Sequence, residues 1–262
     1  MNNTYWQKQS DKPLFPDLLW SRPENRQFAG KLLIIGGNLH GFAAPADAYQ
    51  TTQKAGIGVS RVLLPDALQK TVGKVFLAGE FAPSTPSGSF SQKALAELLA
   101  LSQWSDSVLV AGDLGRNSET AIVLEKFADT YNGQLTITKD AADYFTSTPA
   151  KLLDRPDTLF VISMAQLQKL AINGRFTQSF TFGMDLLRLV DVLHEFTAQH
   201  KIRIIVKHLN TILVAVDGQV STTRLAVDKD IWRVRTAAQA SVWWLQNPNK
   251  PFEALTTAMH TA

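Results

Sequence analysis

KLLIIGGNLHGFAAPADAYQTTQKAGIGVSRVLLP, residues 31–65, is the stretch that decides the fold. It opens with a continuous apolar run that ends in two glycines (31–37), which is typical of a strand buried on both faces. A helix is expected over 45–56, because a proline lies in its first turn and a glycine ends it. Residues 59–65 read as the next strand, so the stretch predicts one strand–helix–strand unit.

The alternation of strands and helices continues to the end of the chain. A Gly-containing turn, Asp217-Gly218, predicts a β-hairpin over 211–225. Strands separated by helices at this spacing predict an α/β fold with a mostly parallel sheet covered on both faces. The further strands are expected over 74–79, 107–112, 134–138, 158–163 and 202–207, and the further helices over 91–103, 117–131, 164–172, 184–199, 231–246 and 251–260.

The chain is expected to form one domain preceded by a short arm. Residues 1–23 are polar and contain three prolines, and we interpret them as an arm that packs late or stays loose. Residues 24–262 contain no internal repeat and no linker long enough to separate two domains. They are therefore expected to form a single α/β domain.

Composition excludes several classes of function. The hydrophobic share of 45% and the charged share of 19% are those of a globular protein, and 26 Lys+Arg against 23 Asp+Glu leaves a net charge of only +3. Such a small excess does not favour nucleic acid as a partner. The chain has no cysteine, which excludes disulfides, thiolate catalysis and Cys-ligated metals and fits a reducing cytoplasm. No apolar run approaches the roughly 20 residues that span a bilayer, so we expect a cytoplasmic protein without a membrane partner.

Three junctions between a strand and the next element are candidates for ligand binding, because ligands of open α/β sheets bind beyond the carboxyl ends of the strands. GGNLHGFAAP (36–45) lacks the Gly-Lys-Ser/Thr of a phosphate loop, and its glycines serve a tight turn at least as well as a ligand. AGDLGRNSET (111–120) offers backbone amides and a helix start to an anion, which Asp113 would oppose. VKHLNT (206–211) ends a strand with a lysine that suits either a phosphate or the solvent.

Other catalytic patterns are missing. No GxSxG motif anchors a hydrolase triad, and the histidines show no metal-site spacing, so no metal site is predicted. Asp140 and Asp143 share one helix face, where a solvated helix start is the expected role. Trp243 and Trp244 suit either a partner surface or, as the default, core packing.

The three junctions, in this order, make residues 24–262 resemble the ADP/ATP-dependent NAD(P)H-hydrate dehydratase family, the C-terminal half of the YjeF-type repair proteins. The stretches that carry the resemblance are KLLIIGGN (31–38), AGDLG (111–115) and VKHLNTILVAVDGQV (206–220). The resemblance implies a ribokinase-like fold, a three-layer α/β/α sandwich with a mostly parallel central sheet and a C-terminal β-hairpin. It also implies a lyase related to carbohydrate kinases, ATP or ADP with Mg2+ as cofactor, and a homo-oligomer.

The chain departs from that family where the chemistry is expected. Of the family's Asp-Ala-Asp segment only Asp140 is kept, and Thr-Pro-His-x-x-Glu is replaced by VISMAQ (161–166). The family's Gly-Thr-Gly-Asp falls on WRVR (232–235), so that Arg235 occupies the position of the acid–base aspartate. A guanidinium stays protonated and cannot act as a general base. With a shifted alignment, Asp228 or Asp230 would substitute for that acid.

Three functions follow, and the sequence does not decide whether the protein is an enzyme. The first is a catalytically degenerate relative, a pseudoenzyme that binds a nucleotide or another phosphate-bearing small molecule. The resemblance implies that the family's glycines expose backbone amides to an anion, an amide hole that Arg233 and Arg235 would replace here. The second is an active dehydratase or a small-molecule kinase of the same fold. The third is an interaction or scaffold protein without a small ligand. No catalytic residue is assigned, and the ligand-binding candidates are Gly36, Gly37, Asn38, Gly112, Gly115, Asp140, Lys207, Thr211, Arg233 and Arg235.

Overall fold

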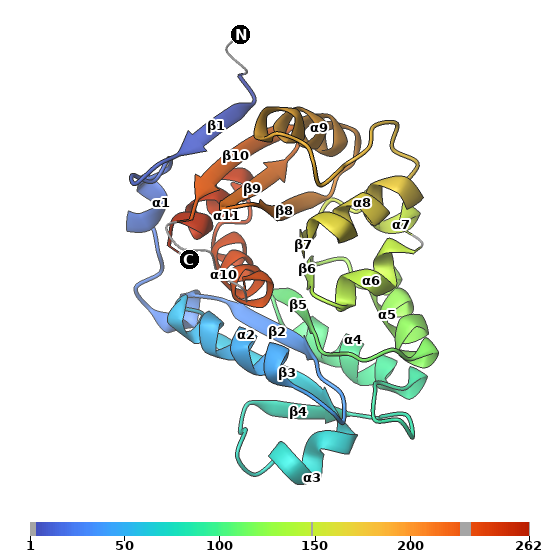
Figure 1. The fold of residues 1–262 in the computed structure, drawn as a ribbon. Helices are drawn as coiled ribbons and strands as arrows, with labels where there is room; N and C mark the ends of the chain where they lie inside the picture. The colour runs from blue at the N-terminus through green and yellow to red at the C-terminus, as the bar shows by residue number, and fades with distance from the viewer. Residues whose placement is uncertain (1–3, 148, 226–231, 262) are drawn as a thin grey trace.

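A computed structural model describes residues 4–147, 149–225 and 232–261 and contains a sheet of ten strands flanked by helices (Figure 1). The strand order is β1-β10-β9-β8-β7-β6-β5-β2-β3-β4, and β9 alone among the described strands runs against the others. The strands are β1 (Trp6–Gln9), β2 (Lys31–Gly36), β3 (Val59–Pro65), β4 (Gly79–Ala82), β5 (Ser107–Gly112), β6 (Gln134–Thr138), β7 (Thr158–Ile162), β8 (Arg203–His208), β9 (Thr211–Val216) and β10 (Gln219–Arg224).

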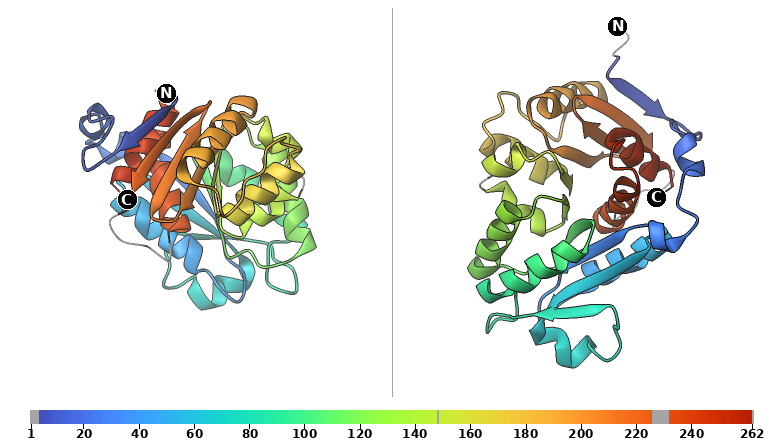
Figure 2. Two further views of the ribbon diagram at one scale, coloured as in Figure 1. Left: turned by 45° about the horizontal axis from the view of Figure 1, so that its top comes forward. Right: turned by 180° about the vertical axis from the view of Figure 1, so that it is seen from behind.

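Helices cover both faces of this sheet, which completes a three-layer α/β/α sandwich (Figure 2). Helices α2, α10 and α11 lie on one face, and α4, α5, α6, α8 and α9 lie on the other. The α-helices are α1 (Asp17–Trp20), α2 (Ala43–Lys54), α3 (Gln69–Val72), α4 (Leu95–Trp104), α5 (Ser118–Thr130), α6 (Ala141–Thr146), α7 (Ala150–Leu153), α8 (Met164–Asn173), α9 (Leu186–Gln199), α10 (Arg233–Gln246) and α11 (Pro251–His260).

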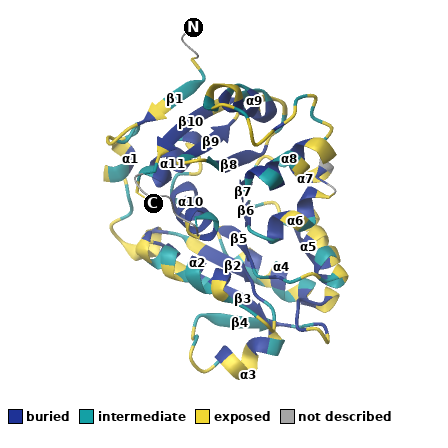
Figure 3. Ribbon diagram, viewed as in Figure 1, coloured by how far each residue is buried: buried dark blue, intermediate teal, exposed yellow. Residues whose placement is uncertain are grey.

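The apolar run of β2 explains why the sheet is covered on both faces. Successive side chains of a strand point to opposite faces, so Leu32 and Ile34 enter the core beneath α2 and α10, while Leu33 and Ile35 enter the core beneath α4 and α5. All four are fully buried, and strand β2 lies in the interior of the molecule (Figure 3). A strand of this composition is stable only between two layers of helices, as the sequence predicts.

The C-terminal part of the chain also agrees with the sequence prediction. Strands β9 and β10 form the expected hairpin, and Asp217 and Gly218 both have positive φ in its turn. Trp243 and Trp244 are fully buried in the core between α10 and the sheet. This confirms core packing for the tryptophan pair and removes it as a partner surface.

The expected N-terminal arm contributes to the sheet instead of staying loose. Residues Trp6–Gln9 form β1, which pairs in parallel with β10 at the edge of the sheet. The Gln9 side chain is buried and donates hydrogen bonds to Thr223 Oγ1 at 3.0 Å and to the Thr256 carbonyl at 2.8 Å. These contacts join residues more than 200 positions apart, so a local pattern could not predict them.

The strand expected over 74–79 is wrong in its position. Residues 74–78 form turns, in which the amides of Val75 and Phe76 donate to the Val72 carbonyl, and the strand β4 begins only at Gly79. Val75 and Leu77 are 81% and 91% exposed. A short apolar run indicates a buried segment only where the tertiary structure covers it, and this one lies at the edge of the sheet.

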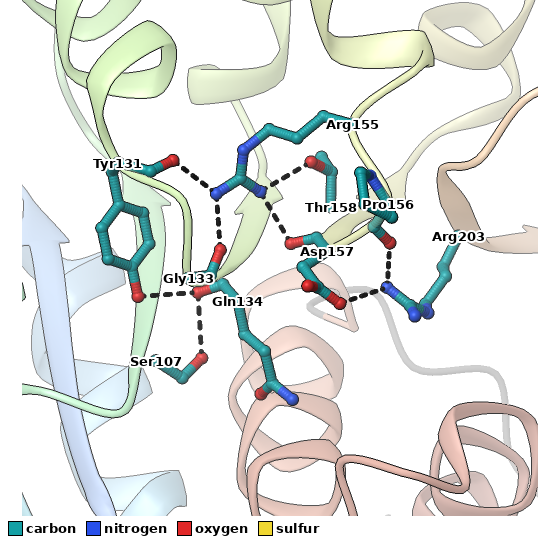
Figure 4. A network of polar contacts seen from close by, with 9 residues as sticks. All are labelled: Ser107, Tyr131, Gly133, Gln134, Arg155, Pro156, Asp157, Thr158 and Arg203. Carbon is teal, nitrogen blue, oxygen red and sulfur yellow. Dashed lines mark hydrogen bonds and ion pairs between the residues drawn. The ribbon is translucent and has the colours of Figure 1, made fainter.

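A polar network ties the amino-terminal ends of neighbouring strands (Figure 4). The Arg155 guanidinium donates to the carbonyls of Tyr131, Gly133 and Asp157 and to Thr158 Oγ1. Because a guanidinium has five N–H donors in a rigid fork, one side chain can hold several carbonyls at once. The network therefore fixes the starts of β6 and β7.

Candidate functional site

The first two glycine junctions meet at the carboxyl ends of β2 and β5. Gly36 lies opposite Gly112 in the sheet, and the Gly37 amide donates to the Gly112 carbonyl at 2.9 Å. The Asn38 side chain donates to the Asp113 carbonyl. The structure thus brings Gly36, Gly37, Asn38 and Gly112 together, with Gly115 next to Asn38.

The Asp140 carboxylate occupies the backbone amides that the second junction was expected to offer to an anion. Its two oxygens accept from the amides of Asp113 and Leu114 at 2.7 and 2.8 Å. Asp140 is therefore not the solvated helix start expected from the sequence. The protein supplies its own anion at this loop, and a ligand would have to displace that anion to use these amides.

The Asp113 carboxylate occupies the amino-terminal end of α2 in the same way. It accepts from the Ala44 amide at 2.7 Å, and it forms an ion pair with Lys139, the residue before Asp140. Asp113 and Lys139 both have left-handed φ values, +58° and +55°. Such values cost non-glycine residues roughly 1–2 kcal/mol each, and the hydrogen bonds around the pair compensate for that cost.

Gln166 and Arg233 join residues 161–166 to residues 232–235, the two segments in which the motifs implied by the resemblance are missing. Gln166 closes a capping box with Ser163 at the start of α8, and its amide group donates to the Lys139 carbonyl at 2.7 Å. Its Oε1 accepts from Arg233 Nη1 at 3.1 Å. The segments around Lys139, Gln166 and Arg233 are far apart in sequence, yet hydrogen bonds join them directly.

These residues border a small hollow at the carboxyl ends of the strands, which we call the strand-end hollow. It has a volume of about 240 Å³ and is lined by Ala43, Ala44, Asp47, Lys139, Trp232, Arg233 and Val234. Trp232 and Val234, at which the resemblance places glycines, carry side chains here, and Val234 is 4% exposed. Side chains therefore fill positions at which a backbone amide hole would need glycine.

Arg233 and Arg235 do not act together, although both were candidates to replace that amide hole. Residues two apart on a helix point in different directions. Arg233 points to Gln166, whereas Arg235 is 62% exposed and lies 3.9 Å from Asp47. Arg235 lines a second, larger cavity together with Arg22 and Lys54. One small ligand therefore cannot occupy a pocket formed by both arginines.

Lys207 and Thr211 lie outside the strand-end hollow. Lys207 pairs with Ile212 and His208 pairs with Thr211 at the tip of the β8–β9 hairpin. The hollow is lined by Lys139, which directly follows β6, and β8 lies two strands away from β6. This corresponds to about 10 Å across a sheet. Asp228 and Asp230, the alternative acids, lie outside the described residues.

Sequence reasoning missed Asp47, Arg22 and Lys54 as site residues. Asp47 lines both cavities, and the other two line the larger one. Each reads in the sequence as an ordinary charged residue on or near a helix, without a motif around it. Only the packing of α2 against α10, which are nearly 200 residues apart, brings Asp47 and Lys54 near Arg235, and Arg22 reaches the larger cavity from the segment after α1.

Neither a cluster of metal ligands nor a membrane-spanning helix occurs among the described residues. Within the described part of the chain, no group of three or more His, Asp or Glu side chains is placed to hold a metal ion. The donor set at the strand ends also does not fit Mg-ATP as the resemblance implies, since the loop amides already bind Asp113 and Asp140. None of the described helices is long and apolar enough to cross a lipid bilayer.

No model of a known protein family matches the sequence, and no curated protein matches it. Solved structures do match the fold. A ribokinase-like superfamily protein of Enterococcus faecalis has a TM-score of 0.73 at 14% identity, over 99% of this chain and 87% of that one. An ADP/ATP-dependent NAD(P)H-hydrate dehydratase of Bacillus subtilis, co-crystallised with ATP/Mg2+, has a TM-score of 0.62 at 11% identity, over 95% and 86%.

A carbohydrate kinase of Agrobacterium tumefaciens is more distant, with a TM-score of 0.51 at 13% identity over 87% of this chain and 88% of that one. At such identities the likeness concerns the arrangement of the elements and not the chemistry of the site. The neighbours include kinases as well as a dehydratase, so the fold is shared across different activities. The chain therefore has the ribokinase-like α/β fold.

Proposed function

We propose that this protein is a catalytically inactive relative of the ribokinase-like enzymes that binds a phosphate-bearing small molecule in the strand-end hollow. The observation that carries the proposal is the position of the carboxylates. Asp113 and Asp140 accept hydrogen bonds from the junction amides, while the cationic side chains of Lys139 and Arg233 face the hollow.

The same arrangement supports the loss of catalysis. A general base has to accept a proton from a substrate within hydrogen-bond reach. Asp113 is already paired with Lys139 and the Ala44 amide, and Asp140 with two amides. Arg235 stands at the acid position of the resembled family and stays protonated. Loss of general acid–base help alone lowers a rate by ~10²–10⁴-fold.

Arg233 supports the binding of an anion. One of its guanidinium nitrogens donates to the uncharged Gln166 side chain, and no ion pair of Arg233 occurs among the described residues. A guanidinium has five N–H donors, so several are available to a phosphate. The hollow of about 240 Å³ lies below the roughly 300–1,000 Å³ of ordinary ligand pockets, which favours a small ligand or the phosphate end of a larger one.

Binding can be tested by isothermal titration calorimetry with inorganic phosphate, ADP and Mg-ATP. We expect Arg233→Gln to weaken phosphate binding by about tenfold or more, since a charge-assisted contact is lost. Arg188→Gln on α9, a change of an exposed arginine far from the hollow, is the matched control. Equal affinities for the wild type and Arg233→Gln would contradict the proposed site.

Catalysis needs its own test, because an active dehydratase is the main alternative. The purified protein is mixed with NADH hydrate and Mg-ATP or Mg-ADP, and NADH absorbance is followed beside an active dehydratase. We expect no turnover above the uncatalysed reaction. Turnover near that of the active enzyme would overturn the proposed inactivity, and Asp228→Asn and Asp230→Asn would then identify the acid.

A further inference from the structure

A second cavity lies between α2 and α10, in the helix layer that covers one face of the sheet. We call it the α2–α10 groove. Its volume is about 400 Å³, larger than that of the strand-end hollow. The two helices pack side by side over the sheet (Figure 1). The groove and the hollow share only Asp47 and Trp232 among their lining residues, so the groove is a separate place for a ligand.

Arg22 forms a fixed cationic wall of the groove. Its guanidinium stacks on the Trp243 ring, with Cζ 4.7 Å from the ring centroid, and donates to the Ala55 carbonyl at the end of α2. It also lies against Gly56, where an added Cβ would come within 2.8 Å of Nη2. These contacts hold the guanidinium in place before any ligand arrives, which reduces the entropy lost on binding.

Arg22 is also partly desolvated without a counter-charge. Burial lowers the pKa of its guanidinium, and none of the described carboxylates forms an ion pair with it. One hydrogen bond to a carbonyl uses only part of the donor capacity of a guanidinium. An arginine that is held in place and partly removed from water interacts strongly with an anion, because the effective dielectric constant there is lower than in water.

Two further cations line the groove, Lys54 in the last turn of α2 and Arg235 in the first turn of α10. Among the described residues that line the groove, Asp47 is the one carboxylate, and its oxygen lies 3.9 Å from Arg235, at the limit of an ion pair. Three positive charges thus face one negative charge. A ligand that carries about two negative charges would balance them.

The neutral groups of the groove suit a polar body attached to that charge. Gln50 and Thr51 on α2 and Thr236 and Gln239 on α10 offer amide and hydroxyl groups to the groove. Gln239 is held by a hydrogen bond to Thr261 Oγ1 at 2.9 Å. Amide and hydroxyl side chains that donate and accept are suited to a hydroxylated molecule more than to an apolar one.

We propose that the α2–α10 groove binds a phosphate monoester of a hydroxylated small molecule, held by the three cations that line it, Arg22, Lys54 and Arg235. A phosphate monoester carries about −1.5 to −2 charges at neutral pH, which matches the charge excess of the groove. The site lies apart from the strand-end hollow and does not depend on it.

Isothermal titration with ribose 5-phosphate at low ionic strength tests the proposal, with inorganic phosphate and ribose as partial ligands. We expect Lys54→Gln and Arg235→Gln each to weaken the binding of ribose 5-phosphate by about tenfold, because each removes one charge-assisted contact. Both side chains are exposed, so neither change should unfold the protein. Lys70→Gln, an exposed lysine on α3, is the matched control and should bind like the wild type.

Arg233→Gln separates the two sites. We expect this variant to bind ribose 5-phosphate in the groove as the wild type does, while it loses phosphate from the hollow. Absence of binding by the wild type, or unchanged affinity in both groove variants, would overturn the groove proposal. Binding lost only in Arg233→Gln would overturn it too, while supporting the proposed function. In Arg233→Gln, equal affinity for inorganic phosphate and for ribose 5-phosphate would show that the hydroxylated body contributes nothing and would refute that part.

Discussion

Gly112 shows how a single residue sets the geometry of the site. Its φ is +105°, and an added Cβ would lie 2.5 Å from Asp140 Oδ1 and 2.9 Å from Lys139 Cβ. Both contacts are shorter than carbon atoms tolerate, and L-residues rarely adopt this φ. The missing side chain therefore lets the Asp140 carboxylate approach the loop amides closely.

Replacing Gly112 by alanine is expected to destabilise the protein by roughly 2–4 kcal/mol, because strain and overpacking add at this position. Urea unfolding followed by far-ultraviolet circular dichroism measures the change. Gly41→Ala is the matched control, since Gly41 lies in the neighbouring junction and an added Cβ there has no other atom within 4 Å. Similar losses in the two variants would show that the close approach at Gly112 does not matter.

Among the elements, β1 shows how a short polar segment becomes part of the sheet. A strand of four residues forms few ladder hydrogen bonds, so it depends on its side chains. Trp6 Nε1 donates to Thr222 Oγ1 at 3.1 Å, and Gln9 bonds both β10 and the α11 backbone. Side chains thus attach the strand to two elements from the other end of the chain.

Gln9→Ala is expected to destabilise the protein by about 1–3 kcal/mol, because buried partners in β10 and α11 lose their donor. Hydrogen exchange should show faster exchange of the β1 and β10 amides, and urea unfolding gives the total loss. Gln7→Ala, at a half-buried residue of the same strand, serves for comparison and should change stability much less. Unaltered exchange at β1 in Gln9→Ala would disprove the anchoring role.

At the scale of the whole molecule, the polar network at the amino-terminal strand ends makes stability depend on alkaline pH (Figure 4). Burial raises the pKa of Tyr131 in this network to about 12, against about 10 for an unfolded tyrosine. Between these values the unfolded chain loses the proton while the folded chain keeps it. The contribution of Tyr131 is therefore complete below pH 10 and is lost as the pH rises towards 12.

The free energy of unfolding is thus expected to fall between pH 10 and 12, with Tyr131 contributing up to roughly 2–3 kcal/mol of that fall. Tyr131→Phe should remove this part, so its stability relative to the wild type should rise with pH. Urea unfolding at pH 8, 10 and 11.5 measures the difference, beside Tyr49→Phe. A constant difference between Tyr131→Phe and the wild type across this range would argue against the raised pKa.

Much of the fold was predictable because the signals were local. Apolar runs such as that of β2, the Asp217-Gly218 turn and the spacing of strands and helices lie within short segments, and each agrees with the structure. The prediction failed at β1 and at residues 74–79, because contacts with distant segments of the chain decide whether such a short stretch becomes a strand of the sheet. The homo-oligomer that the resemblance implies stays a prediction for sedimentation analysis.

The sequence by itself determined the α/β class, the mostly parallel character of the sheet and the absence of thiol chemistry. Only the tertiary structure decided that Asp140 and Asp113 occupy the junction amides and that Arg233 and Arg235 face different cavities. The physical reason is the range of the interactions. Backbone preferences and apolar periodicity act between near neighbours in the chain, whereas a binding site is made by side chains that meet only after the helices have packed on the sheet.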